Sequence, residues 1–137
     1  MPEDVDRVWQ AIVTLVMDSR GDWRKRISEA TGLPFSQMRA LKRLADGPLT
    51  LSELAYAMDA DAPATTVAVN GLEKRGLVER KAREDDRRVK SVSLTAEGKK
   101  VLRHAKTLVE RAPESFRSLT DGDVASLRRI LGRIGAL

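Results

Sequence analysis

The sequence predicts a mainly α-helical protein with one small β-hairpin. Apolar residues recur at steps of three and four over most of the 137 residues, as on the buried face of an amphipathic helix. β-type residues replace this pattern only between residues 77 and 94, on both sides of a charged stretch. Capping residues and glycines divide the helical part into segments, and the length suits one domain with additional helices.

The N-terminal segment has the pattern of a long amphipathic helix. Its apolar stripe begins at Val5, is less apolar at residues 19–21 and resumes at Trp23. Gly32 is expected to end this helix, because glycine readily adopts the left-handed conformation just past a helix end. Pro34 then opens a second helix, with Phe35 on its predicted buried face.

Two short helices follow, joined by a tight turn. Thr50 and Glu53 form a capping box, in which each side chain accepts a hydrogen bond from the other residue's backbone N–H. This box starts a short helix that ends before the turn at residues 59–61. The next helix is expected from Pro63 to Arg75, and Gly76 stops it.

A hairpin and further helices complete the chain. Residues 77–78 and 89–94 are expected to be strands, with a polar tip at residues 83–88. Thr95 should cap the following helix, which Pro113 interrupts, and Thr120 should cap the last helix. That helix has an apolar stripe formed by Val124, Leu127, Leu131 and Ile134.

Two short helices, a tight turn and a β-hairpin in this order predict a winged helix-turn-helix, a fold whose second helix enters a DNA major groove. The net charge of +5 suits a polyanionic partner. Residues 74–90 hold eight basic residues against four acidic ones, although such a hairpin can also be a solvated edge. We predict an N-terminal dimerisation helix at residues 1–32, a DNA-binding domain at residues 33–94 and C-terminal dimerisation helices at residues 95–137.

Three segments resemble the MarR family of bacterial regulators. They are GPLTLSELA at residues 47–55, LEKRGLV at residues 72–78, and DRR at residues 86–88 with SLT at residues 93–95. The resemblance implies a homodimer that binds pseudo-palindromic double-stranded DNA, most often as a repressor. It also implies that Arg88 reaches into a minor groove while Asp86 orients it, and that Arg87 contacts a phosphate or the groove. A plain turn role for Asp86 is the alternative.

The predicted recognition helix departs from the family pattern, because Val67 stands where many members have an exposed arginine. Base reading is then expected from Thr65, Thr66 and Asn70, with methyl contacts from Ala64 or Val67, which favours A·T-rich sites. The other expected DNA contacts are Ser52 at a helix start, Arg83 in the wing, and phosphate contacts from Arg39, Lys42 or Arg43.

The resemblance further implies a small aromatic or lipophilic effector between the dimer helices and the DNA-binding domain. The residues expected to line this site are Trp23, Ile27, Phe35, Met38, Val101 and His104. An apolar stripe can also be plain core, and a single histidine is often a packed or solvent-facing one. The apolar stripes of the first and last helices are expected to pair between subunits rather than within one.

The composition argues against several other classes of function. The chain has no cysteine and one histidine, so we expect no disulfide, no thiol switch, no metal site and no cofactor. No nucleophile–base arrangement is evident, and we expect no enzymatic activity. No apolar run approaches the roughly 18 residues of a membrane helix, so a cytoplasmic location is expected. The alternative function is a winged-helix module that binds protein instead of specific DNA.

Overall fold

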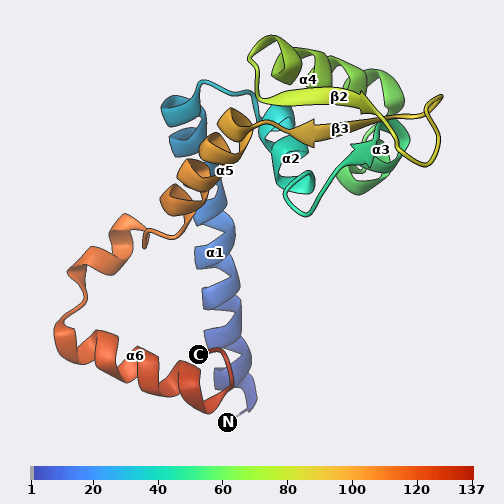
Figure 1. Cartoon of the computed structure of the whole chain (residues 1–137). Coiled ribbons are helices and arrows are strands. Elements are labelled where there is room, and N and C mark those ends of the chain that lie inside the picture. Colours follow the sequence, from blue (N-terminus) through green and yellow to red (C-terminus); the bar gives the residue numbers. More distant parts are fainter. Residues whose placement is uncertain (1) are drawn as a thin grey trace.

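The computed structural model describes residues 2–137 as helices around a small sheet (Figure 1), which confirms the predicted fold class. Met1, the first residue of the predicted N-terminal segment, lies outside the described residues. The elements in chain order are α1 (Pro2–Thr31), α2 (Phe35–Arg43), β1 (Leu49–Thr50), α3 (Leu51–Met58), α4 (Ala62–Lys74), β2 (Val78–Ala82), β3 (Lys90–Leu94), α5 (Ala96–Val109), a 3-10 helix (Glu114–Ser118) and α6 (Asp121–Arg133).

Helix α1 is continuous over 30 residues, as the sequence predicts, and residues 19–21 lie within it. The hydroxyl of Ser19 donates to the carbonyl of Leu15 at 2.7 Å, so this polar side chain is satisfied within the helix although it is buried. The helix ends as predicted at Gly32, whose φ is +70°. One uninterrupted rod therefore runs from the N-terminus to the globular part of the molecule (Figure 1).

The predicted helix caps are present. The capping box of Thr50 and Glu53 starts α3, and Thr95 accepts the Gly98 backbone N–H at the start of α5. A second capping box joins Thr120 and Asp123 at the start of α6. The Thr120 backbone N–H donates to Asp123 and holds the pKa of that carboxyl below its usual value. These caps fix where the short helices begin.

The sheet has one strand more than the predicted hairpin. Strands β2 and β3 pair antiparallel with Val78 opposite Leu94 and Ala82 opposite Lys90. The two-residue strand β1 pairs with the other edge of β3, which gives the order β1-β3-β2. The extra strand ties the start of α3 to the base of the wing, because Thr50 is both the last residue of β1 and the cap of α3.

The core lies between α2, α3, α4 and the sheet. Its most completely buried side chains are Leu33, Leu41, Leu44, Leu54, Leu72, Val69, Val92 and Thr65. Helix α5 packs onto α1, α2 and β3 through a face that includes Ala105. Phe35 does not join this core as predicted, because 45% of its surface is exposed at the start of α2.

Gly98 allows α5 to approach the sheet closely. A Cβ at this position would lie 2.0 Å from the carbonyl oxygen of Leu77, a backbone atom that cannot move alone. We expect Gly98→Ala to lower the free energy of unfolding by about 1–3 kcal/mol, as overpacking does elsewhere. Thermal or urea unfolding measures this change.

The matched control for that substitution is Gly21→Ala in the middle of α1. A Cβ there meets nothing within 4 Å, and alanine favours a helix over glycine by about 1 kcal/mol. We therefore expect Gly21→Ala to stabilise the protein. Equal effects of the two substitutions would show that Gly98 has no packing role.

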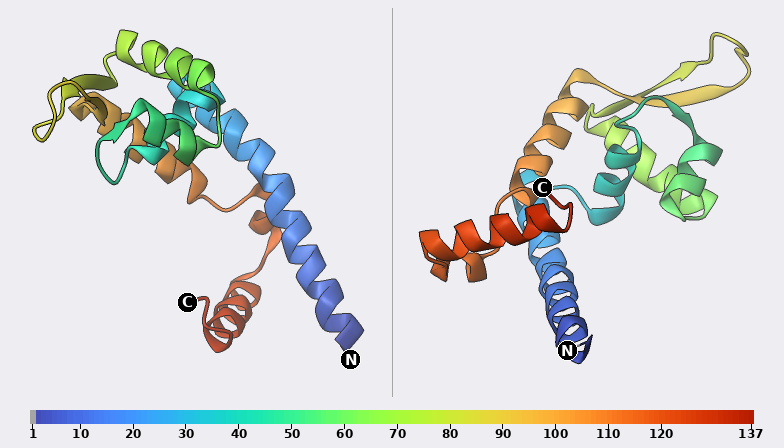
Figure 2. Two further views of the ribbon diagram at one scale, coloured as in Figure 1. Left: turned by 90° about the vertical axis from the view of Figure 1, so that its right-hand side faces the viewer. Right: turned by 90° about the horizontal axis from the view of Figure 1, so that it is seen from below.

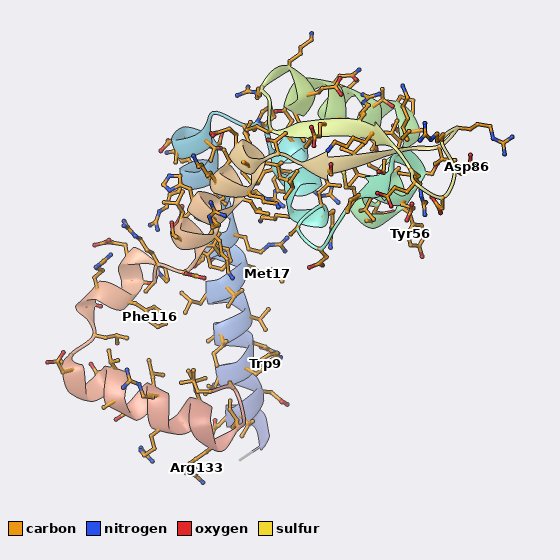
Figure 3. The ribbon with its side chains drawn as sticks, in the orientation of Figure 1. Trp9, Met17, Tyr56, Asp86, Phe116 and Arg133 are labelled. Atoms are coloured by element: carbon orange, nitrogen blue, oxygen red, sulfur yellow. The ribbon has the colours of Figure 1, made fainter. Side chains whose placement is uncertain are left out.

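Helix α6 and the N-terminal half of α1 extend away from the rest of the molecule (Figures 1 and 2). None of the α6 residues is buried. Large apolar side chains are nevertheless exposed on both helices, and Figure 3 shows Trp9 and Met17 projecting from α1. Among the described residues, no helix is both long and apolar enough to cross a membrane.

Candidate nucleic-acid interface

The tip of the hairpin presents an arginine that a neighbouring carboxylate holds in place. Asp86 Oδ1 accepts hydrogen bonds from the Arg88 backbone N–H at 3.0 Å and from Arg88 Nε at 3.3 Å. The predicted contact between these two residues is therefore present. The Arg88 side chain remains 92% exposed, so its guanidinium projects into solvent from an anchored base. Arg87 is also exposed at this tip.

Arg83 has a different position from the other arginines of the wing. It forms ion pairs with Asp85 at 3.0 Å and with Glu53 of α3 at 3.6 Å. Because Glu53 also belongs to the capping box of α3, Arg83 joins the wing to the helix-turn-helix. We therefore interpret Arg83 as a brace for the wing rather than as the free DNA contact predicted from sequence.

Helix α4 presents a weakly polar outer face. Val67 is 71% exposed, Ala64 is exposed and Thr66 is half-buried. The prediction for Thr65 is wrong: its side chain is 1% exposed, and its hydroxyl donates to the carbonyl of Asp61 at 2.9 Å. Thr65 falls on the same side of α4 as Val69 and Leu72, so it belongs to the core and cannot contact a base.

Asn70 is exposed on α4, but part of its amide is already engaged. Its Oδ1 accepts a hydrogen bond from Arg80 of β2, and Arg80 Nε lies 3.4 Å from Glu73 Oε2. Two-point recognition of adenine uses both the oxygen and the nitrogen of an asparagine amide. Such recognition by Asn70 would therefore have to share the oxygen with Arg80, while the amide nitrogen remains available as a donor.

The wing tip and the N-terminal end of α4 project from the same end of the molecule. In Figure 1 both lie at the right-hand side, away from the N-terminus and α6, and the left view of Figure 2 looks onto this end. Asp86 is labelled at the tip in Figure 3. Ser52, in the first turn of α3, is exposed in the same lobe. An elongated ligand could thus contact the helix and the wing together.

A second feature is a cavity of about 680 Å³ between α1 and α2. Four of the six residues predicted for an effector site line it, namely Trp23, Ile27, Phe35 and Met38. Its wall also carries cations that the effector-site prediction did not include, which are Arg20, Arg24, Lys25, Arg39, Lys42 and Arg43. Within residues 2–137, no acidic side chain is part of this wall.

Two predicted effector residues lie elsewhere. Val101 packs against the core and His104 is exposed on α5, and neither lines the cavity. Val109, two turns further along α5 than Val101, lines the cavity instead. Arg39 lies at the cavity wall and bonds to the carbonyl of Met58, a placement that differs from the predicted phosphate contact.

Aromatic and cationic side chains lie close together in the cavity. The guanidinium carbon of Arg24 lies 4.0 Å from the centre of the Phe35 ring, and that of Arg39 lies 5.7 Å from it. The Trp23 Nε1–H is buried and has no acceptor in the described part of the chain. A buried donor without an acceptor costs free energy, which a ligand oxygen would recover. The helical spacing of Phe35, Arg39, Lys42 and Arg43, which places them on one side of α2, was the available sequence signal for the cationic wall.

These features define a winged helix-turn-helix protein with additional outer helices. Residues 31–89 match the model of the MarR family. Over this segment the chain is similar to the MarR family, and its fold is that of MarR-family transcriptional regulators. None of the curated proteins matches the chain significantly.

Solved structures agree over nearly the whole chain. The transcriptional regulator BldR from Sulfolobus solfataricus is 28% identical with a TM-score of 0.60, and the alignment covers 94% of this chain and 97% of BldR. The reduced form of MarR from E. coli is 22% identical with a TM-score of 0.67, covering 92% and 95%. A mutant of S. aureus MepR, solved bound to an oligodeoxyribonucleotide, is 18% identical with a TM-score of 0.72, covering 92% and 94%.

Proposed function

We propose that this protein is a DNA-binding transcriptional regulator, acting as a repressor, and not an enzyme. Helix α4 enters a major groove while the wing places Arg88 in the neighbouring minor groove. The observation that carries this proposal is the exposed Arg88 guanidinium, anchored by Asp86 at the same end of the molecule as the start of α4. A narrow A·T-rich minor groove has an enhanced negative potential that attracts such an arginine.

The outer helices support action as a homodimer. The exposed apolar side chains of α1 include Val5, Val8, Trp9, Ile12, Val16 and Met17, and those of α6 and its C-cap include Val124, Leu127, Ile130 and Ile134. A second copy of the chain would cover these faces and remove a large apolar area from water. It would also present two α4 helices to half-sites about one DNA turn apart, which implies a pseudo-palindromic operator.

The cavity supports control of DNA binding by a small aromatic effector. Its volume of about 680 Å³ suits a ligand of one or two rings, and its cationic wall favours a molecule that carries a negative charge. Ligand control requires that the effector bind one spacing of the two DNA-binding domains more tightly than the other. The cavity lies between α1, which is one of the outer helices, and α2 of the DNA-binding lobe. A ligand bound there can therefore favour one spacing of the two DNA-binding domains over another.

Selection of DNA from a random pool tests the regulator function. We expect the purified chain to enrich one A·T-leaning, inverted-repeat site, with affinity that falls steeply as salt rises because phosphate contacts release counterions. Binding to the selected site should exceed binding to random DNA by about a thousandfold or more. Equal affinity for all DNA would favour the alternative, a winged-helix module that binds protein.

The exposed apolar side chains of Tyr56 and Val67 are the observation that favours this alternative. Tyr56 of α3 is 91% exposed, and Figure 3 shows it pointing away from the lobe. Such side chains contribute to protein interfaces as well as to contacts with thymine methyl groups. The selection experiment separates the two functions without needing to identify a partner.

A further inference from the structure

Arg39 connects two parts of the molecule that the proposed function treats separately. Its guanidinium donates to the carbonyl of Met58, the last residue of α3, across a separation of 19 residues in sequence. The same side chain lines the cavity between α1 and α2. Among the described cations of the cavity wall, it is the one with a hydrogen bond to a helix of the helix-turn-helix.

The carbonyl that Arg39 binds lies at the turn that aims α4. The backbone of Asp59, immediately after Met58, is left-handed with a φ of 51°, and Asp61 caps α4 two residues later. The final carbonyls of a helix lack partners within the helix, so a cation that binds one of them stabilises the helix end. Arg39 therefore helps to fix the turn between α3 and the proposed recognition helix.

An anion in the cavity would compete for the same guanidinium. The bond from Arg39 to the Met58 carbonyl has one charged partner, whereas a bond to a carboxylate has two and adds direct Coulomb attraction, so a carboxylate attracts arginine more strongly than a backbone carbonyl does. The guanidinium groups of Arg24 and Arg39 both lie near the Phe35 ring, so an aromatic ligand beside this ring can place its carboxylate near both. A two-point contact with a carboxylate that uses the Arg39 Nη2 group would draw on the same nitrogen that donates to Met58 and would weaken that bond.

We propose that Arg39 transmits occupancy of the cavity to the recognition helix. An aromatic carboxylate draws the Arg39 guanidinium toward Phe35, the Met58 carbonyl loses its partner, and the turn at residues 59–61 loosens. DNA binding then weakens because α4 is no longer held at a fixed angle. This inference rests on the proposed function for its final step, and by linkage DNA must weaken ligand binding by the same factor.

The first test needs no DNA. The probe is 2-naphthoate, with the neutral 2-naphthamide as a control of the same shape, and Trp23 fluorescence in a Trp9→Phe background reports binding. We expect naphthoate to quench Trp23 and to accelerate amide hydrogen exchange at residues 59–65. In Arg39→Met the quenching should persist, because Arg24 and Trp23 remain, whereas the faster exchange should disappear. The proposal would be overturned if naphthoate accelerated amide exchange in Arg39→Met as much as in the parent, or if it did not quench Trp23 fluorescence in the parent.

The second test measures coupling on the selected DNA site. Naphthoate should weaken DNA binding about tenfold in the parent, within the usual range for allosteric coupling, and naphthamide should not. Lys42→Met removes the same charge from the cavity wall without touching Met58, and should keep the coupling that Arg39→Met loses. If DNA binding proves unspecific while the exchange result holds, the proposed function fails and the link from cavity to turn stands. Equal coupling in Arg39→Met and Lys42→Met would refute the role of Arg39.

Discussion

Replacing Leu127 by aspartate should convert the proposed dimer to a monomer. Leu127 lies in the middle of α6 on the same side as Leu131 and Ile134, and 37% of its surface is exposed within the protomer. A carboxylate at the centre of an apolar interface loses its hydration without gaining a partner, which strongly opposes association. Sedimentation velocity at micromolar concentration should show the change directly.

The same substitution should weaken binding to the selected DNA by about a hundredfold or more, because the second half-site no longer binds as part of one molecule. Ala125→Asp is the matched control, since residue 125 lies on the opposite side of α6 and is also exposed. Circular dichroism separates a folded monomer from an unfolded chain. A Leu127→Asp protein that still sediments as a dimer would contradict the assignment of α6 to the subunit interface.

Loss of the Arg88 side chain should produce the second large effect. We expect Arg88→Ala to weaken binding to the selected site by about 1–3 kcal/mol and to relax the preference for A·T pairs at the outer positions of the site. Asp86→Ala should have a smaller effect in the same direction, because Arg88 keeps its charge and loses only the two hydrogen bonds that orient it, at 3.0 Å from its backbone N–H and at 3.3 Å from its Nε. Fluorescence anisotropy on the selected site and on variants of its outer positions measures both.

Arg117→Ala controls for the loss of one positive charge. Arg117 lies in the 3-10 segment, far from the wing, and pairs with Glu114 at 3.6 Å. Its removal should leave the base preference unchanged. If Arg88→Ala and Arg117→Ala weakened binding equally, Arg88 would contribute only to net charge.

Local sequence signals predicted most of the fold. The caps at Thr50, Thr95 and Thr120 and the stop at Gly32 are short-range features that depend on neighbouring backbone groups, and all four are present. The strand β1 was missed because two residues carry no periodicity. Residues 19–21 are helical as predicted, and the Ser19 hydroxyl donates to a carbonyl of the same helix.

The candidate site was less predictable because it depends on which side of a helix faces the core. Thr65 is a polar residue that looked available for base contact, yet packing against Val69 and Leu72 decides its orientation. Arg83 and Arg39 carry the same group as Arg88, but each has a partner distant in sequence that composition cannot reveal. Asp86 and Arg88 could be predicted because their contact spans two residues.

Methylation interference on the selected DNA tests the central claim most directly. Dimethyl sulfate modifies guanine N7 in the major groove and adenine N3 in the minor groove, so one experiment reports contacts in both. We predict interference at major-groove positions in each half-site and at flanking minor-groove adenines, with only the minor-groove signal lost in Arg88→Ala. Minor-groove interference that is absent, or that survives in Arg88→Ala, would contradict simultaneous contact by α4 and the wing with neighbouring grooves.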